Sequence, residues 1–365
     1  MKVWRAVLAG IVAGLAVASP ASAHSQDAPG ASDYRTTVTA ITPALPDLTV
    51  RTVDAGASLE LRYTGPSTIE VLGYSGEPYL GVGPGGVRQN VRSPATYLNE
   101  TLRGGAEGGD ASAAPEWRQL STTPVVRWHD HRAHWMGPQP PVAARQPDLP
   151  HRLREWSIPL RDGVREFRVT GTLDWAPRPE AWAWWGGAVA LGVLVALLAG
   201  WRPRTGSRDG VGGVRPAGSP GRLPWSAGPD AGWRARGLGM GRRVGPGVLA
   251  ALAGGLSLAD STGRVLDAGT FQRDDLWGFA AGVATLTAAG YALLRRPAAD
   301  FALGLAGAAL ALLCGFSRVA VFQHAIAPVP WNGLWARISV AGCLGIGLAL
   351  AAVAGLRLRR PAPTA

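Results

Sequence analysis

Three histidines and a methionine lie close together near the middle of the chain, in the segment Trp128–Met136. The candidate donors are His129, His131, His134 and Met136. Imidazole nitrogen is a good ligand for copper and zinc, and thioether sulfur favours Cu(I). In an extended strand, side chains two residues apart project to one face, so His129 and His131 share a face, and a turn would bring the other two donors beside them. This pattern predicts a metal site, with copper as the first candidate cofactor.

Two further histidines are lesser candidates for the same site. His24 would add an imidazole and a free amine at a mature N-terminus, and His151 follows the cluster in the sequence. The alternative interpretation is structural. The histidines of the cluster alternate with other residues, so they can form the solvated face of a strand, or bind backbone groups and lipid headgroups. The sequence leaves both interpretations open.

Motifs for other kinds of chemistry are missing from the sequence. It contains no Walker A motif, no G-x-S-x-G nucleophile elbow and no H-E-x-x-H zinc motif. We expect Glu77 and Asp130 to be separate acids on the surface rather than a catalytic pair. The sequence therefore predicts a protein that is not an enzyme.

The net charge of +11 does not indicate a nucleic-acid partner, because of where the positive residues lie. Residues 24–181 contain 16 Arg and 18 Asp or Glu, whereas residues 201–243 contain 9 Arg and 2 Asp. This excess of Arg adjoins long apolar stretches, where cytoplasmic loops keep their positive charge. Membrane orientation explains the charge, so we expect the lipid bilayer as a partner and no nucleic acid.

Residues 1–23 have the pattern of a secretory signal peptide. A positively charged start and a short apolar core precede Ala21-Ser22-Ala23, which is a small-residue cleavage site. The mature protein would begin at His24. Both cysteines, Cys314 and Cys343, lie in later apolar stretches, so we expect no disulfide in the exported part, which must build its own core.

Residues 24–180 predict an extracytoplasmic antiparallel β-sandwich. Short segments alternate apolar and polar residues with the period of two that a half-buried strand requires, and Gly, Pro and Asp turns separate them. Strands are expected at residues 37–41, 48–53, 58–63, 68–72, 79–82, 125–128, 156–160 and 166–173. Eight short strands at this spacing, with no competing helical period, are typical of a sandwich.

The rest of the chain predicts an α-helical transmembrane region of about five spans. The first span is expected at residues 181–201, and four more lie within residues 244–356, at 244–259, 276–294, 301–322 and 338–356. An Arg-rich, Gly- and Pro-rich segment at residues 202–243 is expected to be a disordered cytoplasmic loop, and residues 357–365 a cytoplasmic tail.

Arginine placement sets the predicted orientation of these spans. Clusters of Arg favour the cytoplasmic side, so the N-terminal domain and the loops at 260–275 and 323–337 would be outside and the C-terminus inside. Arg318 is expected to extend to the lipid headgroups, and Asp260 to lie at a span end without a special role.

Three tracts of the exported domain resemble uncharacterised actinobacterial membrane proteins with an exported β domain. They are residues 72–80, 93–97 and 128–132. The resemblance covers most of the exported domain and continues into the spans, and it implies no assigned activity. The architecture is also loosely similar to the CopC and CopD copper-handling proteins, which would imply copper. The chain departs from CopC because it lacks a methionine-rich loop and because His24 precedes a polar leader rather than a strand.

We therefore expect a membrane-anchored, non-enzymatic protein of the cell envelope whose exported domain binds a metal ion. The alternative is a structural or assembly protein whose exported domain recognises another envelope or membrane protein.

Overall fold

The structure is a computed structural model that describes residues 30–105, 107–200, 230–269 and 271–359. The predicted signal peptide, His24, Trp201 and residues 202–229 of the predicted loop lie outside the described residues. The chain divides into two compact units. The first contains the chain up to Ala181 together with Gly263–Phe271 and Ala320–Ala336, and the second contains the rest.

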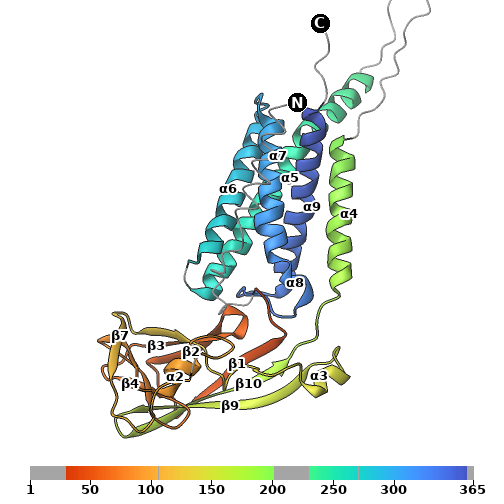
Figure 1. The fold of residues 1–365 in the computed structure, drawn as a ribbon. Coiled ribbons are helices and arrows are strands. Elements are labelled where there is room, and N and C mark those ends of the chain that lie inside the picture. Colours follow the sequence, from red (N-terminus) through yellow and green to blue (C-terminus); the bar gives the residue numbers. More distant parts are fainter. Residues whose placement is uncertain (1–29, 106, 201–229, 270, 360–365) are drawn as a thin grey trace, which may run out of the picture. The chain divides into compact units, whose positions relative to one another are not determined.

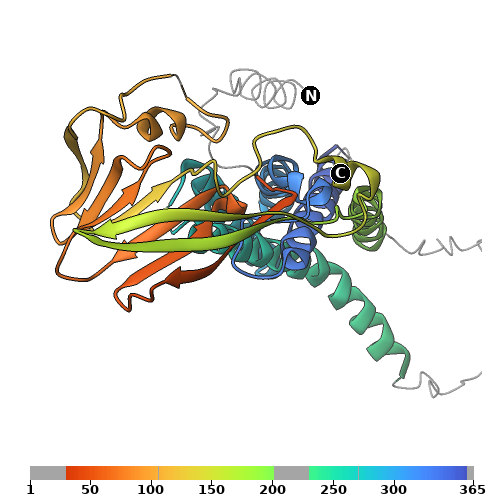
Figure 2. The ribbon, with the colours of Figure 1, turned by 90° about the horizontal axis from the view of Figure 1, so that it is seen from below.

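The first unit is antiparallel β structure, as predicted. Its strands, labelled in Figure 1, are β1 (Tyr34–Thr42), β2 (Leu48–Val53), β3 (Ser58–Tyr63), β4 (Ile69–Leu72), β5 (Pro78–Gly83), β6 (Gly86–Asn90), β7 (Trp117–Ser121), β8 (Val125–Trp128), β9 (His151–Asp162) and β10 (Arg165–Trp175). They form a seven-stranded sheet in the order β1-β10-β9-β4-β5-β6-β7 and a three-stranded sheet in the order β2-β3-β8. The long β9–β10 hairpin, yellow-green in Figure 2, occupies the second and third positions of the larger sheet.

All eight predicted strands are present, and β2, β3 and β8 have the predicted bounds. Strands β6 and β7 were not predicted. β6 follows β5 through a turn at Gly85-Gly86, where Gly86 has φ +93° and an added Cβ would lie 2.1 Å from the backbone oxygen of Ser121. Only glycine fits this position, because other residues rarely adopt that φ and would also collide with β7.

Two short helices in this unit were also not predicted. They are α2 (Pro94–Leu98) and α3 (Pro141–Arg145), and each begins with proline, which suits the first helical position. The Ser93 hydroxyl caps α2 by accepting from the backbone N–H of Ala95 at 3.2 Å. A single turn of helix is too short to produce the periodic pattern from which longer helices are predicted.

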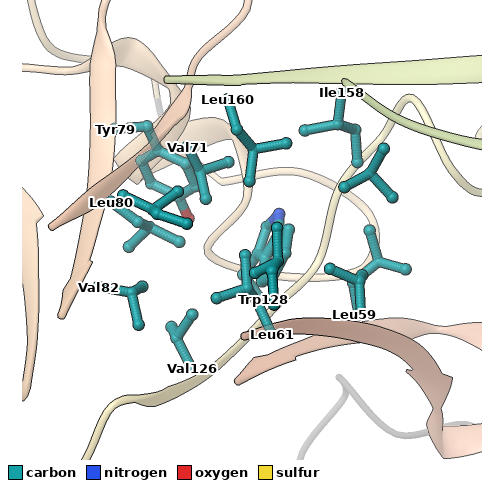
Figure 3. Packing of buried hydrophobic residues seen from close by; sticks show 14 of the residues in the cluster. Leu59, Leu61, Val71, Tyr79, Leu80, Val82, Val126, Trp128, Ile158 and Leu160 are labelled. Atoms are coloured by element: carbon teal, nitrogen blue, oxygen red, sulfur yellow. The ribbon is translucent and has the colours of Figure 1, made fainter. Parts of the chain in front are cut away.

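Both sheets contribute side chains to one apolar core. Figure 3 shows Leu59, Leu61 and Trp128 of the smaller sheet together with Val71, Leu80 and Leu160 of the larger one. Leu59 and Leu61 are at most 1% exposed, since residues two apart on a strand point to the same side. Burial of each such leucine contributes about 2 kcal/mol, so this unit has an apolar core of its own.

Two segments from the second half of the chain pack within the first unit. In the segment Ala320–Ala336, Ile326 forms a β-bridge with Ser32: the Ser32 N–H donates to the Ile326 oxygen at 2.9 Å, and the Ile326 N–H donates back at 2.7 Å. In the segment Gly263–Phe271, the Asp267 carboxylate accepts from the backbone N–H of Ala55 at 3.5 Å.

A buried carboxylate strengthens the first of these attachments. Asp33, 4% exposed, accepts from Nε of Arg178 at 2.7 Å, from Nδ1 of His324 at 3.0 Å and from the Ala325 N–H at 3.1 Å. Although burial acts to raise the pKa of Asp33, these donors hold it below its usual value. One side chain thus joins the start of β1, the residues before α4 and the segment after α8.

The helical region begins at α4. Its elements are α4 (Ala181–Gly200), α5 (Asp230–Ala268), α6 (Arg273–Leu293), α7 (Ala299–Leu310), the π-helix η2 (Ala311–Gly315), the 3₁₀-helix η3 (Phe316–Arg318), α8 (Ala320–Gln323) and α9 (Gly333–Leu358). Four stretches of the described chain are long and apolar enough to cross a membrane: Ala181–Ala199, Asp274–Leu293, Ala299–Arg318 and Gly333–Leu358.

The predicted second span, residues 244–259, lies in α5 but is not among these four stretches. Polar residues, among them Asp260 and Arg264, and many glycines keep the hydropathy of α5 low. The helix also begins at Asp230, so its first 14 residues lie within the segment predicted to be a disordered loop.

Arg318 and Asp260 form a buried ion pair inside the second unit. Their side chains are 7% and 2% exposed, and Nη1 of Arg318 lies 2.6 Å from Oδ2 of Asp260 and 3.1 Å from the Ser261 hydroxyl. An added Cβ at Gly278 of α6 would lie 2.3 Å from Nη2 of Arg318, so a larger residue there would displace the guanidinium. The prediction that Arg318 extends to the headgroups is therefore wrong.

Candidate functional site

The histidine segment begins where β8 ends. The last residue of β8 is Trp128, and the chain then forms a turn in which the Ala133 N–H donates to the Asp130 oxygen at 2.8 Å. The expectation that His129 and His131 share one strand face is therefore wrong, because the strand does not continue to His131.

His129 lies against the turn between β2 and β3. Its Nδ1 is 2.9 Å from the backbone oxygen of Ala57 and 3.4 Å from the Ser58 hydroxyl, and the residue is 8% exposed. A carbonyl oxygen only accepts hydrogen bonds, so Nδ1 of a neutral His129 carries the proton. The lone pair of that imidazole is then on Nε2.

His131 and His134 lie together at a different place, beside residues 101–102. Their rings meet edge to face, with centroids 5.1 Å apart. Nε2 of His131 is 3.3 Å from the oxygen of Thr101, and Nε2 of His134 is 2.9 Å from the oxygen of Leu102. The three histidines of the segment therefore lie in two different environments, His129 in one and His131 with His134 in the other.

The second ring nitrogen of His134 also faces a carbonyl oxygen. Nδ1 is 3.1 Å from the oxygen of Asp130. Two carbonyl acceptors favour a protonated ring, yet burial, helped by the neighbouring imidazoles, lowers the pKa of His134 to about 4. At neutral pH His134 is uncharged, and its two nitrogens face backbone oxygens rather than an open coordination position.

Asp130 is the centre of the hydrogen-bond network of this segment. It is 1% exposed, and its two carboxylate oxygens accept from Nε of Arg132 at 2.8 Å, from Nη2 of Arg132 at 2.8 Å and from Nε1 of Trp128 at 3.1 Å. The Arg132 guanidinium in turn lies over the ring of Tyr74, 4.8 Å from its centroid. The acid that we expected on the surface is thus a buried partner of arginine.

Tyr74 and Arg132 connect the segment to the turn between β4 and β5. Nη2 of Arg132 donates to the oxygen of Leu72 at 3.1 Å. The Tyr74 hydroxyl accepts from the His131 N–H at 3.0 Å and donates to Oδ1 of Asn99 at 2.5 Å. Burial and the nearby Asp130 raise the pKa of Tyr74 to about 12, so the phenol keeps the proton that it donates.

Glu77 connects the same turn to α2. It is 6% exposed, and it accepts from the Ser93 hydroxyl at 2.6 Å and from the Ser75 N–H at 3.0 Å. The expectation of a surface acid is wrong here too. The tracts 72–80, 93–97 and 128–132, which carried the sequence resemblance, therefore meet in one network.

The remaining candidate ligands lie apart from this network or outside the described residues. Met136 is 44% exposed, and Nε2 of His151, the first residue of β9, is 2.8 Å from the oxygen of Gln146. His24 lies outside the described residues. Within the described ranges, no group of three or more His, Cys, Asp or Glu side chains is arranged to hold a metal ion. Metal binding by this segment stays a prediction.

Sequence reasoning did not identify three residues that hold the segment. Tyr74 and Asn99 support His131, and Nη2 of Arg154 on β9 donates to the oxygen of His131 at 2.8 Å and also to the oxygen of His134. Tyr74 lies in one of the resembling tracts, which was a signal that it mattered. The sequence contained no such signal for Arg154, because an arginine on a strand is most often exposed to solvent.

Comparison of the chain with models of protein families, with curated proteins and with solved structures gives no match. The site is therefore interpreted from its own geometry.

Proposed function

We propose that this chain is a multi-pass cell-envelope protein whose N-terminal β-sandwich is an extracytoplasmic scaffold that recognises another envelope or membrane protein. One observation carries the proposal: the polar groups of the histidine segment are used within the domain, around Asp130 and Arg132, which favours a rigid scaffold over a metal centre. The proposal includes a cleaved signal peptide, five spans and a cytoplasmic C-terminus.

The two segments that join the first unit support five spans. The chain leaves this unit after Ala181 and returns to it at residues 263–271. It then leaves again and returns a second time at residues 320–336. If the unit lies on one side of a bilayer, each departure and return requires two crossings, and α9 makes one more. In this topology α5 is the return crossing after α4.

The ion pair of the second unit makes α5 more suitable as a span. A charged side chain in a bilayer is costly unless it faces the bundle interior and has a partner. Asp260 of α5 is 2% exposed and pairs with Arg318 at 2.6 Å, so its charge is compensated inside the helical unit. Low hydropathy alone therefore does not argue against α5 as the fifth span.

Cysteine labelling on intact cells tests the topology. We expect Ser75→Cys and Thr270→Cys to react with an impermeant thiol reagent, and Ser207→Cys to react only after lysis. The native Cys314 and Cys343 are at most 2% exposed, which keeps the background low. Labelling of Ser207→Cys from outside would overturn the orientation.

Met136 is the part of the histidine segment that a partner would meet. It is 44% exposed, and the preceding Trp135 is anchored by stacking on Tyr34, with ring centroids 6.4 Å apart. A flexible, polarizable thioether on a fixed backbone suits adaptable protein contacts.

Photo-crosslinking in cells tests the partner. A photoreactive amino acid at Met136 should give one adduct of defined mass. The same amino acid at Val164, which is fully exposed in the β9–β10 turn, is the matched control and should give none. No adduct at either position, or equal adducts at both, would contradict recognition through this segment.

A second candidate function, metal binding, is supported by one observation at His129. Metal-ligating histidines usually donate their other ring N–H to a carbonyl or carboxylate, and Nδ1 of His129 has such a partner in the oxygen of Ala57. Its Nε2 would be the ligand atom. The copper measurement described in the Discussion tests this candidate.

A further inference from the structure

A cavity of about 420 Å³ lies within the first unit. It is lined by residues of β1 and β2, the short helix η1 (Asp54–Gly56), the end of α5 and the chain after α8. This volume is within the range of small-ligand sites, roughly 300–1,000 Å³. β1 and β2 are edge strands of their sheets, so the cavity lies where the two sheets are not hydrogen-bonded to each other.

Two arginines are among the residues that line this cavity. The side chain of Arg35, in β1, has no ion pair or hydrogen bond within the described part of the chain, although its backbone belongs to the β1–β10 ladder. Arg51 of β2 is half exposed, and it uses only Nε for its bond to Oε1 of Glu60 at 2.8 Å. Its two terminal amino groups have no acceptor among the described residues. Arginine presents donors in a planar fork that fits phosphate oxygens.

Hydroxyl groups complete the set of available donors. Thr37 of β1 and Thr52 of β2 also line the cavity, and their hydroxyls make no hydrogen bond within the described chain. Arginine and threonine donors together are typical of sites that bind phosphate groups.

The one acid in the lining is already engaged. Asp267 accepts from the Ala55 N–H at 3.5 Å, and burial, together with the like charge of Asp54, raises its pKa. The Asp267 carboxylate therefore faces the backbone of η1, where Asp54 and Ala55 both have φ +56°. The available charge in the cavity is therefore positive.

We propose that this cavity binds an anionic phosphate group, held by Arg35 and Arg51 with the hydroxyls of Thr37 and Thr52. The phosphate belongs either to a phospholipid headgroup or to a soluble phosphate compound. The lipid source rests on the proposed topology, because cavity residues Asp267, Ile326, Ala327 and Val329 lie in segments that this topology places next to the extracytoplasmic face of the membrane. The phosphate chemistry does not depend on that topology.

The test uses the full chain, purified in a neutral detergent, and two probes. Inorganic phosphate is titrated by isothermal calorimetry. Native mass spectrometry then counts the lipid retained from mixtures of phosphatidylglycerol and phosphatidylcholine. Preferential retention of phosphatidylglycerol identifies a headgroup site, whereas phosphate binding without that preference identifies a soluble ligand.

Arg35→Gln should weaken the binding of the effective probe about tenfold, since it removes a charge-assisted hydrogen bond. Arg168→Gln is the matched control: Arg168 is an exposed arginine of β10 that does not line the cavity, and binding should be unchanged. Because the side chain of Arg35 has no partner in the described chain, Arg35→Gln should keep the wild-type thermal midpoint. The proposal is overturned if the wild-type protein binds neither probe saturably, or if Arg35→Gln binds as tightly as the wild type.

Discussion

Replacing Asp130 by Asn should destabilise the first unit through the change of one heavy atom in a buried network. The Asn keeps one carbonyl oxygen, but its amide nitrogen replaces the second acceptor, which Nη2 of Arg132 and Nε1 of Trp128 now share. Two donors then face a donor, and the guanidinium, only 19% exposed, loses its counterion. Removing one partner of a buried pair costs about 3–5 kcal/mol, and this pair belongs near the lower end because Arg132 keeps some solvent contact. A loss of about 3 kcal/mol corresponds to a thermal midpoint lower by roughly 6–12 °C in a domain of this size.

Thermal unfolding of the full chain in detergent, followed by tryptophan fluorescence, measures this loss. The matched control is Asp148→Asn, because Asp148 is exposed and has no ion pair in the described chain; its midpoint should change by less than 1 °C or so, as for an ordinary surface substitution. Equal midpoints for Asp130→Asn and the wild type would refute the conclusion that a charged Asp130 holds the segment together.

Three further predictions follow from the ion pair and the histidines. Arg318→Ala leaves the carboxylate of Asp260 buried without this arginine and should cost about 3–5 kcal/mol, seen as aggregation on gel filtration in detergent; the double variant with Asp260→Ala should restore a monodisperse peak, and failure to do so would argue against the pair. Burial lowers the pKa of folded His134 to about 4, below the value near ~6.5 of the unfolded chain, so the unfolded state binds protons first and stability should fall as the pH drops from about 6.5 to 4. His134→Gln should flatten that part of the pH dependence in thermal melts, and an unchanged slope would assign it to another group. If the metal prediction holds, the wild type binds copper below micromolar concentration and the His129→Asn, His131→Asn double variant does not; equal binding by both proteins, or by neither, would leave the histidines structural.

The sequence determined those features that depend on neighbouring residues. The alternation in residues 48–53, 58–63 and 125–128 identified β2, β3 and β8 with their bounds, because a period of two is a local property of a strand with one buried face. Long apolar stretches likewise identified α4, α6 and α9, since length and composition alone decide whether a helix can cross a bilayer.

Only the tertiary structure decided how the polar residues are used. Asp130 was predicted to be a surface acid. Its burial depends partly on Tyr74, which is distant in the sequence, so no local pattern indicated it. For the same reason, the sequence did not indicate that Arg318 and Asp260 form an ion pair. His129 and His131, two residues apart, were expected on one face, but β8 ends at Trp128 and the two imidazoles bind carbonyl oxygens of different parts of the chain. A side chain's partner depends on which distant segments fold against it, and local patterns contain no record of that choice.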